Sequence, residues 1–380
     1  MNPVWTELAA AAATLWWLIL ALPWHPWGTA ERLDAPLDAR QEDLSDVTVL
    51  IPARNEAGTV SRVLDSLAAQ GPGLRVILVD DESSDGTAAA ARRSRIENLT
   101  VLTSIPLPPG WTGKLWALEQ GRSMVASPLT LLLDADIALA PGTVAALRHR
   151  LRDQGLQLVS LMAAPDLTRF WERALMPAFI YFFKLLYPFR LANARHRLVA
   201  AAAGGCVLLE TERLARIGGF GAIRDALIDD CALARRVKID GGRTWIGLTR
   251  SARMLRHHGF RDIWDMVART AFTQLRYSVL LLLLCSGLLL LAFAVPVAGF
   301  GAHGPWPPML CAGAWAGMLI SYRPTLRFYG LPTAWGLALP LVGTLYLAMT
   351  WWSAIRYWRG HRSQWKDRTY ARISKDGVSR

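Results

Sequence analysis

The sequence is poor in cysteine and has fewer acidic than basic residues. Its four cysteines, at 206, 231, 285 and 311, form no CxxC pair and no zinc-finger spacing with histidine. We therefore expect buried thiols in a reducing compartment, without a disulfide framework or a zinc site. The 42 basic residues outnumber 30 acidic ones, but no basic stripe is interleaved with aromatic residues. This pattern argues against a nucleic-acid partner.

No lysine or arginine precedes the apolar run from Leu8 to Trp24, and no small-residue cleavage site follows it. A secretory signal peptide needs both features, so we interpret residues 1–28 as an uncleaved transmembrane anchor. Arg32 and Arg40 follow the run, and the positive-inside rule then places the next domain in the cytoplasm. We expect a multi-pass protein of the cell inner (plasma) membrane.

Membrane segments are also expected near the C-terminus, within residues 278–356. The three apolar segments there are Val279–Phe300, Pro308–Tyr322 and Leu331–Ile355. The first is long enough to span a bilayer, the second is shorter, and Pro340 interrupts the third. Arg323 and Arg327 place the loop between the last two inside, so three crossings would put the basic tail, residues 357–380, outside. Either one segment is re-entrant or interfacial or the tail is external, and we favour a cytoplasmic tail that meets anionic membrane lipids.

Another apolar stretch, residues 174–191, is rich in aromatic side chains but carries Lys184 and Pro188. An internal lysine and a proline argue against a membrane span, so we favour an amphipathic helix that lies in the membrane interface. The alternative is a buried helix of the soluble domain.

Between residues 45 and 277, short β-branched runs alternate with helical patterns. The predicted strands are Val47–Ile51, Val76–Val79, Thr100–Leu102, Leu129–Leu133 and Leu156–Leu161. The predicted helices are Gly58–Ala69, Gly86–Arg93, Leu115–Val125 and Gly142–Arg152. The alternation predicts an α/β domain with a largely parallel sheet, helices on both faces, and a ligand site at the carboxyl ends of the strands.

Polar clusters follow three of the predicted strands. They are Pro52-Ala53-Arg54-Asn55-Glu56, Asp80-Asp81-Glu82-Ser83-Ser84-Asp85-Gly86 and Asp134-Ala135-Asp136. One acidic pair at such a place is usually a turn or a helix cap, but three clusters indicate a site. Asp134 and Asp136 would repel each other without a cation, and Mg²⁺ or Mn²⁺ on carboxylates commonly completes its shell with substrate phosphates. This pattern favours a nucleotide diphosphate as ligand.

Two helix starts carry charges whose role the local sequence leaves open. Lys114 follows Gly113 at the first, which suits either a phosphate site or an exposed turn. Asp229 and Asp230 begin the second, where they either complement the helix dipole or supply a general base for an acceptor hydroxyl. We interpret the pair at 257 and 258, both histidines, as a polar loop outside the site.

Together the motifs resemble those of family 2 glycosyltransferases over roughly residues 47–280. The motifs that carry the resemblance are PARNE, VDDESSDGT, GK-x-WA, LDADI, the GG at Gly204, IGGF and DDCALARR. The resemblance implies a GT-A (Rossmann-like) nucleotide-sugar-binding domain over residues 45–277. The layout is similar to that of ceramide glucosyltransferases and, more closely, of bacterial hopanoid-associated glycosyltransferases. It implies an inverting hexosyltransferase that moves one sugar from a nucleotide sugar, expected to be a UDP-sugar, to a membrane lipid acceptor in hopanoid biosynthesis.

The resemblance also assigns residues to the donor. The nucleotide-sugar-binding residues would be Pro52, Arg54, Glu56, Asp80, Asp81, Lys114 and Asp134. Within this set, Asp80 or Asp81 would bind the uracil and ribose, and Lys114 would approach the diphosphate. The others would border the nucleotide.

Metal binding and catalysis are assigned in the same way. Asp136, with Asp134, would hold a Mg²⁺ or Mn²⁺ ion or the ribose. Asp230, beside Asp229, would be the catalytic base. Arg276 would donate hydrogen bonds to the leaving diphosphate.

This sequence departs from the family pattern in the segment just before the membrane and in the tail. Membrane members carry Q/R-x-x-R-W where this chain has Thr273-Gln274-Leu275-Arg276-Tyr277, and the tail motif W-K-G-R-x-Y has Asp367 in place of glycine. In processive synthases the tryptophan contacts the polymer acceptor, so its replacement by Tyr277 favours single-sugar transfer. The alternatives are a processive polysaccharide synthase and an inactive GT-A scaffold, although a scaffold would be expected to have lost its acidic positions.

Overall fold

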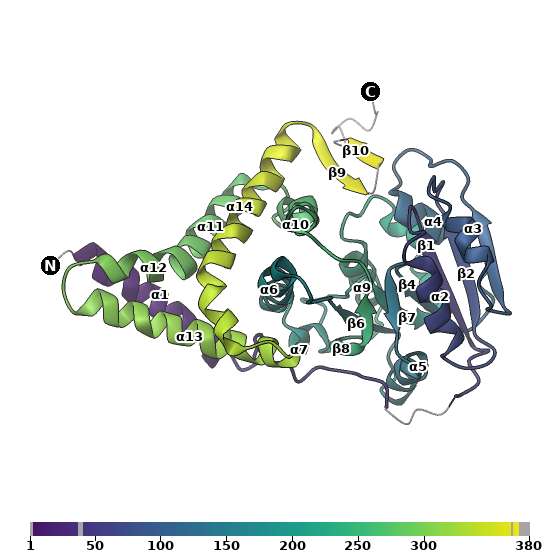
Figure 1. Cartoon of the computed structure of the whole chain (residues 1–380), viewed down its shortest axis with the longest axis horizontal. Coiled ribbons are helices and arrows are strands. Elements are labelled where there is room, and N and C mark those ends of the chain that lie inside the picture. The colour runs from purple at the N-terminus through teal and green to yellow at the C-terminus, as the bar shows by residue number, and fades with distance from the viewer. Residues whose placement is uncertain (1–2, 37–40, 366–367, 372–380) are drawn as a thin grey trace.

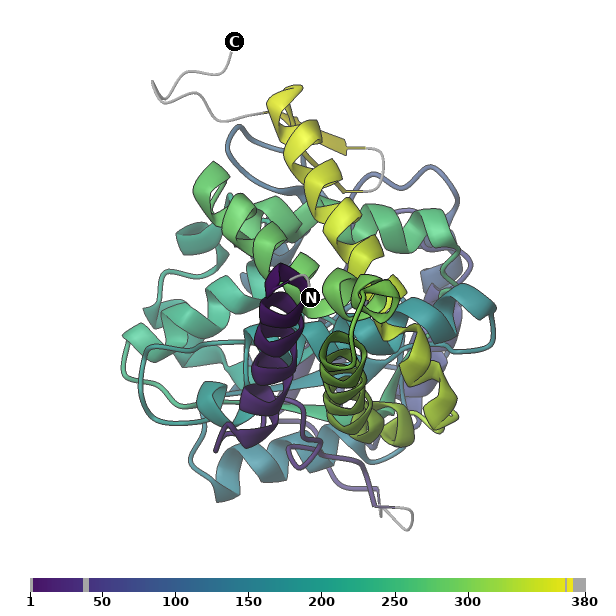
Figure 2. The same ribbon diagram turned by 90° about the vertical axis from the view of Figure 1, so that its left-hand side faces the viewer.

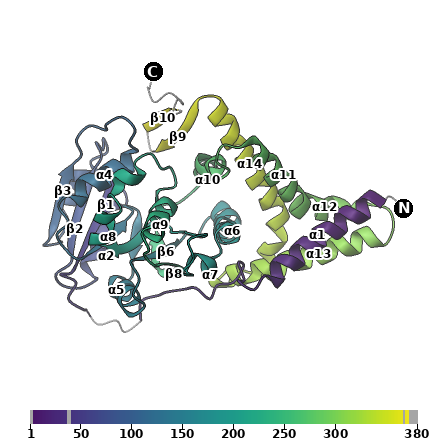
Figure 3. The same cartoon turned by 180° about the vertical axis from the view of Figure 1, so that it is seen from behind.

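A computed structural model describes residues 3–36, 41–365 and 368–371 (Figure 1). Arg40, Lys366, Asp367 and residues 372–380, on which parts of the topology and tail predictions rest, lie outside the described residues. The elements form an α/β domain around one large sheet and a group of apolar helices on one side of it (Figures 1 and 3).

The sheet has eight strands in the order β3-β2-β1-β4-β7-β6-β8-β5. Their bounds are β1 Val47–Ala53, β2 Arg75–Asp80, β3 Leu99–Thr103, β4 Leu129–Leu133, β5 Ile137–Leu139, β6 Leu158–Ala164, β7 Cys206–Glu210 and β8 Thr244–Met254. Strands β1 to β4 run parallel to one another, as do β6 and β8. The prediction of a largely parallel sheet is confirmed for the five predicted strands, β1 to β4 and β6, which all run in one direction. The sequence analysis missed β5, β7 and β8, and two of these are antiparallel to their neighbours: β7 to β4 and β6, and β5 to β8. A short apolar run does not encode its direction, so these pairings were not visible in the sequence.

Helices cover both faces of the sheet. They are α2 Val60–Ala68, α3 Thr87–Arg92, α4 Gly113–Arg122, α5 Thr143–Asp153, α8 Thr211–Arg216 and α9 Asp229–Ile239, with the 3-10 turn η1 Phe220–Ile223. The alternation of β1 shows how the faces are divided: Val49 and Ile51 join the core that includes residues of α2 and α5, whereas Leu50 joins the core with residues of α4 and α9. All nine predicted elements are present, with ends displaced by only a few residues.

Gly121 lets α4 lie unusually close to the sheet. A Cβ atom at this position would collide with Leu50 of β1 and would lie 2.9 Å from Val79 Cγ2 of β2. Because α4 begins at Gly113 and carries Lys114 in its first turn, this close approach fixes where Lys114 stands.

The apolar helices come from both ends of the chain. They are α1 Pro3–Ala21, α11 Val279–Leu289, the π-turn η2 Leu290–Ala294, α12 Val295–Ala298, the 3-10 turn η3 Gly299–Gly301, α13 Trp306–Phe328, the 3-10 turn η4 Thr333–Ala338 and α14 Leu339–Trp358. By length and composition, three described stretches could cross a membrane: Pro3–Ala21, Val279–Gly301 and Thr333–Trp358. The predicted segment Pro308–Tyr322 lies within α13, which is not among these three.

Helices α6 (Phe170–Leu186), α7 (Phe189–Ala192) and α10 (Phe260–Gln274) lie between the two parts (Figure 1). In α6 the Lys184 side chain is 1% exposed, and its Nζ donates hydrogen bonds to the Gly28 carbonyl at 2.7 Å and to Thr325 Oγ1 at 3.1 Å. The stretch predicted as interfacial is therefore packed inside the protein along much of its length. This favours the buried-helix alternative there, although Leu186 and Arg190 stay exposed. After α14, strands β9 (His361–Trp365) and β10 (Arg368–Ala371) form an antiparallel pair.

Candidate active site

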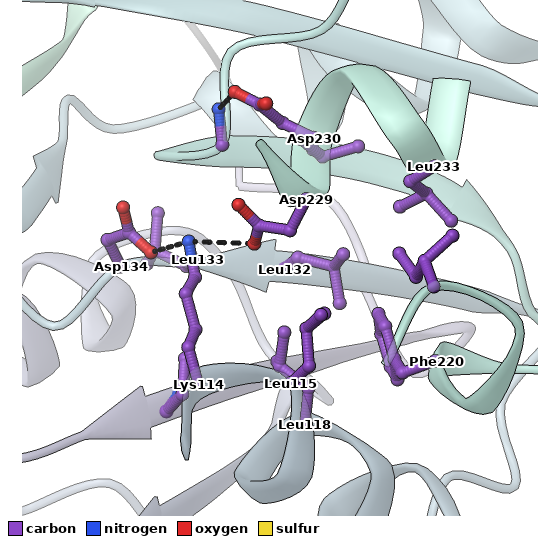
Figure 4. A pocket seen from close by; sticks show the side chains of 14 residues that line it. Lys114, Leu115, Leu118, Leu132, Leu133, Asp134, Phe220, Asp229, Asp230 and Leu233 are labelled. Atoms are coloured by element: carbon purple, nitrogen blue, oxygen red, sulfur yellow. Dashed lines mark hydrogen bonds and ion pairs between the residues drawn. The ribbon is translucent and has the colours of Figure 1, made fainter. Parts of the chain in front are cut away.

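Five of the predicted site residues line one pocket at the carboxyl ends of β1 and β4 (Figure 4). They are Pro52, Lys114, Asp134, Asp229 and Asp230. The remaining lining is largely apolar, from residues such as Leu118, Leu132, Phe220 and Leu233. Charged groups at the mouth of an apolar pocket interact more strongly than they would in water, because the local dielectric constant is lower.

Lys114 joins two of the acidic residues. Its Nζ lies 3.0 Å from Asp134 Oδ1 and 3.3 Å from Asp229 Oδ2 (Figure 4). Burial acts to lower the pKa of Lys114, but the charges of Asp134 and Asp229 outweigh it and raise the pKa. The ammonium is therefore charged at any physiological pH, and it is placed where a diphosphate could bind in exchange for a carboxylate partner.

Asp230 is held by two backbone groups. Gly204 N–H donates to its Oδ2 at 2.8 Å, and Cys231 N–H donates to its Oδ1 at 2.7 Å. A Cβ atom at Gly204 would lie 3.4 Å from both Asp230 Oδ2 and Lys114 Nζ, so this position borders both charged groups. Burial, and then the charge of Asp229, raise the pKa of Asp230 to about 7. A carboxylate with that pKa is suited to accept a proton at neutral pH.

Asp80 and Asp81 are almost fully buried at the end of β2, outside the pocket lining. The Arg54 guanidinium donates to the Asp81 carbonyl and lies 3.8 Å from Asp81 Oδ2. Within the part of the chain that the structure describes, Asp80 Oδ1 is buried without a hydrogen-bond partner. Because a buried acceptor without a donor is costly, Asp80 is poised to bind an N–H or O–H group of a ligand.

Glu56 and Asp136 face a residue that the sequence analysis did not select. Arg256 Nη2 donates to Glu56 Oε2 at 2.6 Å, and Arg256 Nε lies 3.6 Å from Asp136 Oδ2. Neither acidic residue lines the pocket. The signal that could have identified Arg256 is its place beside the two histidines, which the sequence analysis set aside as a polar loop.

The loop that carries Arg256 is anchored by Glu172 of α6. Glu172 is fully buried, and it accepts hydrogen bonds from His258 N–H at 2.9 Å and from Arg169 N–H at 2.8 Å. Asp166, Glu172 and His257 bring three metal-type side chains together, but these backbone bonds already occupy both oxygens of Glu172. We interpret this group as structural.

The residues at 134 and 136 fit a divalent cation by their chemistry. Both are carboxylates, the donors that Mg²⁺ and Mn²⁺ prefer, and both are partly exposed at the end of β4. Each carboxylate already has a basic partner, Lys114 or Arg256, so the local charge of the pair is compensated without an ion. An ion bound here would share the carboxylates with these cations.

Arg276 is not brought to the pocket. It is exposed, follows α10, and does not belong to the lining. Arg276 and Tyr277 both have positive φ angles, of 51° and 58°, as the chain turns from α10 towards α11. The Tyr277 ring, at the position of the family's tryptophan, stacks on Tyr357 with centroids 4.3 Å apart. The pocket therefore brings together the predicted base, Asp230, with three of the seven predicted donor residues, Pro52, Lys114 and Asp134, but not with the predicted diphosphate arginine.

A family model described as "Glycosyltransferase like family 2" matches residues 45–271, which is well over half of the chain. The protein therefore belongs to this glycosyltransferase family, as the motifs predicted.

Curated relatives match a smaller part of the chain. The 4,4'-diaponeurosporenoate glycosyltransferase of Staphylococcus haemolyticus (strain JCSC1435) is 34% identical over 100 residues, 26% of each chain. The enzyme of the same name from Staphylococcus aureus (strain MRSA252) is 33% identical over 129 residues, 33% of this chain and 34% of that one. The matches thus span about a third or less of these relatives' length.

A solved structure covers nearly the whole chain. The mannosyltransferase PcManGT from Pyrobaculum calidifontis, in complex with GDP-Man and Mn²⁺, matches 93% of this chain and 98% of its own, with a TM-score of 0.53 and 20% identity. At this identity the likeness shows the fold alone, and it confirms the predicted GT-A class.

Proposed function

We propose that the protein is a membrane-bound enzyme that transfers one sugar from a nucleotide sugar to a lipid hydroxyl, with inversion at the anomeric carbon. The observation that carries the proposal is Asp230, whose pKa is raised to about 7 in the pocket that also holds Lys114 and Asp134. A base matched to neutral pH beside a cation for a diphosphate is the pair of groups that this reaction needs.

The donor would extend along the carboxyl ends of the strands. Asp80 and Asp81 would bind the base and ribose, beside Arg54, because they supply buried acceptors there. Lys114 would bind the diphosphate. Asp134 and Asp136 would hold a Mg²⁺ or Mn²⁺ ion, which supplies positive charge to the departing diphosphate.

The transfer would be a single displacement. The acceptor oxygen forms a bond to the anomeric carbon while the bond from that carbon to the diphosphate oxygen breaks. Asp230 takes the hydroxyl proton, and the nucleoside diphosphate leaves with the bonding electron pair beside Lys114. Attack on the face opposite the leaving group inverts the anomeric carbon, and no covalent sugar–enzyme intermediate is needed.

We propose a polyisoprenoid-derived lipid such as a hopanoid as acceptor, and a UDP-sugar as donor. The apolar helices beside the α/β domain, and the acceptor named for the staphylococcal relatives, support a lipid acceptor. We further propose that the α/β domain is cytoplasmic. Arg32 follows α1 on the side of the α/β domain, and the positive-inside rule favours the cytoplasm for that side.

The test is release of nucleoside diphosphate by the purified protein in lipid nanodiscs. A panel of UDP- and GDP-sugars is combined with hopanoid, sphingoid and polyprenol lipids, in Mg²⁺, Mn²⁺ or EDTA. We expect release that needs lipid and is lost in Asp230→Asn, but not in the control Asp153→Asn, an exposed position on α5 outside the pocket. Release unchanged in Asp230→Asn would refute the catalytic assignment.

Mass spectrometry of the product separates the remaining alternatives. One added hexose per lipid supports single transfer, and a ladder of added sugars would show a processive synthase. Absence of turnover and of nucleotide binding across the whole panel would favour an inactive scaffold.

A further inference from the structure

Helix α13 pairs with the N-terminal anchor along its first part, and only its end contacts the α/β side, where Thr325 accepts from Lys184 and the Phe328 carbonyl accepts from Arg250 of β8. Gly317 in α13 packs against α1 so closely that a Cβ atom there would lie 2.8 Å from Trp16 Cβ. Helices α1, α12 and α13 project together away from the sheet, with the N-terminus at their far tip (Figures 1 and 3). Helix α13 has 23 residues, or about 35 Å of helix, enough to cross a bilayer core of about 30 Å.

From Tyr346 onwards, helix α14 is attached to α6 and α10, the helices next to the sheet, and it also contacts α11, where Trp351 Nε1 donates to Ser286 Oγ at 2.9 Å. Tyr346 Oη donates to the Leu175 carbonyl of α6 at 3.0 Å, Phe272 N–H of α10 donates to Ser353 Oγ at 3.0 Å, and Arg356 lies 3.3 Å from Asp265 of α10. Helix α10 is amphipathic and carries charged residues, so it cannot lie in the hydrocarbon core. A helix bonded to α10 in this way is held at the level of the α/β domain.

The opposite face of α14 is exposed and mostly apolar. Leu337 in η4 and Leu341, Ala348 and Trp352 in α14 share this face at helical spacings, and all four are exposed. At its C-terminal end the Arg359 guanidinium lies 6.0 Å from the centre of the Trp352 ring. An apolar face that ends in tryptophan and arginine is typical of a helix at the level of lipid headgroups.

The charges agree with this arrangement. The chain between α12 and α13, residues 299–305, has no lysine or arginine, and neither has the chain before α1. Near the other ends of these helices stand Arg323 and Arg327 of α13, and Arg356 and Arg359 follow in and after α14. The basic residues thus lie on the side of the α/β domain, as the positive-inside rule requires for a cytoplasmic domain.

We infer that α14 lies in the plane of the membrane interface, with its exposed face against the lipid surface, while α1, α11–α12 and α13 are the three crossings. Figure 2, which looks from the side of the apolar helices, shows α14 (yellow) running across the view. The inference rests on the proposed membrane-bound function. It removes the conflict met in the sequence, because three crossings including α1 place the tail on the same side as the α/β domain.

Hydropathy alone predicts the opposite arrangement, because it identifies α14 as a membrane span and does not identify α13 as one. If α14 crosses and α13 does not, the loop between them faces the side opposite the α/β domain. If both cross, the tail is on that side. Two positions, one in η4 and one after α14, therefore distinguish the three arrangements.

The experiment uses single cysteines at His303, Thr333 or Ser363 in full-length protein whose four native cysteines are replaced by alanine. Spheroplasts are labelled with a membrane-impermeant maleimide before and after lysis. We expect position 303 to be labelled in intact cells, and positions 333 and 363 only after lysis. Labelling of 333 on the same side as 303, or of 363 on the same side as 303, would overturn the inference.

Two further outcomes would contradict the proposed function without contradicting the in-plane position of α14, or would contradict both. If 333 and 363 share the side opposite to 303 but the whole pattern is reversed, α14 remains in the plane and only the cytoplasmic placement of the domain fails. If carbonate extraction releases the protein from membranes, the proposed membrane-bound function itself fails.

A depth measurement tests the lipid contact directly. Nitroxide labels at Leu341 and Trp352 are 11 residues apart, which is about 16 Å along a helix. In nanodiscs, an in-plane α14 places both labels at similar depth, with oxygen accessibility that exceeds that of a control label at Asp153. A depth difference close to the full helical rise, or water-like accessibility at both positions, would overturn the inference.

Discussion

The proton acceptor is the part of the proposal that can be tested most sharply. Because the pKa of Asp230 is raised to about 7, about a tenth of the protein has the carboxylate ionised at pH 6, about half at pH 7 and about nine tenths at pH 8. The rate with saturating donor should therefore rise about tenfold from pH 6 to pH 8 along a single ascending limb. The measurement is kcat against pH in nanodiscs, with donor and lipid fixed.

Two substitutions test whether the ascending limb of the pH profile reports the ionisation of Asp230. Asp230→Asn removes the base, and we expect kcat to fall by about 10²- to 10⁴-fold with little change in donor binding. Asp229→Asn removes a neighbouring negative charge that raises the pKa of Asp230, so the ascending limb should move to lower pH. A limb that stays in place in Asp229→Asn, or a pH-independent rate in the wild-type protein, would refute the reasoning. The pH profile also depends on the acceptor group. An acceptor that reacts through an ionised carboxylate, instead of a hydroxyl, has no proton to lose and would need no base.

The same group affects folding. A carboxyl whose pKa is raised from 3.8 to about 7 keeps its proton in the folded state over a pH range in which the unfolded chain has lost it. Its contribution to stability is therefore present at low pH and is lost as the pH rises towards 7. Without ligand, the difference in Tm between wild-type protein and Asp230→Asn should move against the wild type from pH 5 to pH 7.5. An unchanged difference would contradict the assigned pKa.

Three further predictions concern cations and anchors. Lys114→Gln should weaken binding of the nucleoside diphosphate by about 10- to 100-fold in calorimetry, which is the loss expected when one charge-assisted hydrogen bond is removed. An unchanged Kd would show that Lys114 does not bind the diphosphate. Arg256→Gln should tighten Mn²⁺ binding, followed by the signal of free Mn²⁺, because a cation next to Asp136 is removed; weaker binding would show that Arg256 supports the ion. Glu172→Gln should lower Tm by several degrees because its carboxylate accepts two buried backbone hydrogen bonds. The exposed control Glu212→Gln should leave Tm unchanged, and an equal effect in both would contradict the anchoring role.

Five of the eight strands, and the acidic residues at the ends of β2 and β4, were predictable from the sequence because both depend on local order, whereas β5, β7 and β8 were missed. A buried strand followed by an acidic pair places those carboxylates at its carboxyl end, and this pattern is enough to locate Asp80 and Asp134. The partnerships across the chain were not accessible. Arg256 lies 200 residues from Glu56 and reaches it only because β8 runs parallel to β6 and delivers the loop after it to the same edge.

The membrane helices show the same limit. Hydropathy measures how apolar a segment is, whereas its role depends on what covers it. Arg323 and Arg327 lower the mean hydropathy of helix α13, although this helix packs on α1 through Gly317. Helix α14 has a high mean hydropathy because its buried face is apolar, but that face packs against α6 and α10 as well as against the other apolar helices. Contacts distant in sequence, with the Gly28 carbonyl and Thr325, likewise explain how Lys184 is buried in a stretch that the sequence analysis interpreted as interfacial.

The close packing at Gly121 suggests a way to make a temperature-sensitive variant. A methyl group there would push the C-terminal end of α4 away from β1 and β2, and the displaced helix would shift the ammonium of Lys114, two helical turns away, without altering any reacting group. Gly121→Ala should therefore behave as a conditional allele. Cells that carry it would make the glycolipid at low temperature and lose it on warming, which would let the moment of synthesis be chosen during growth.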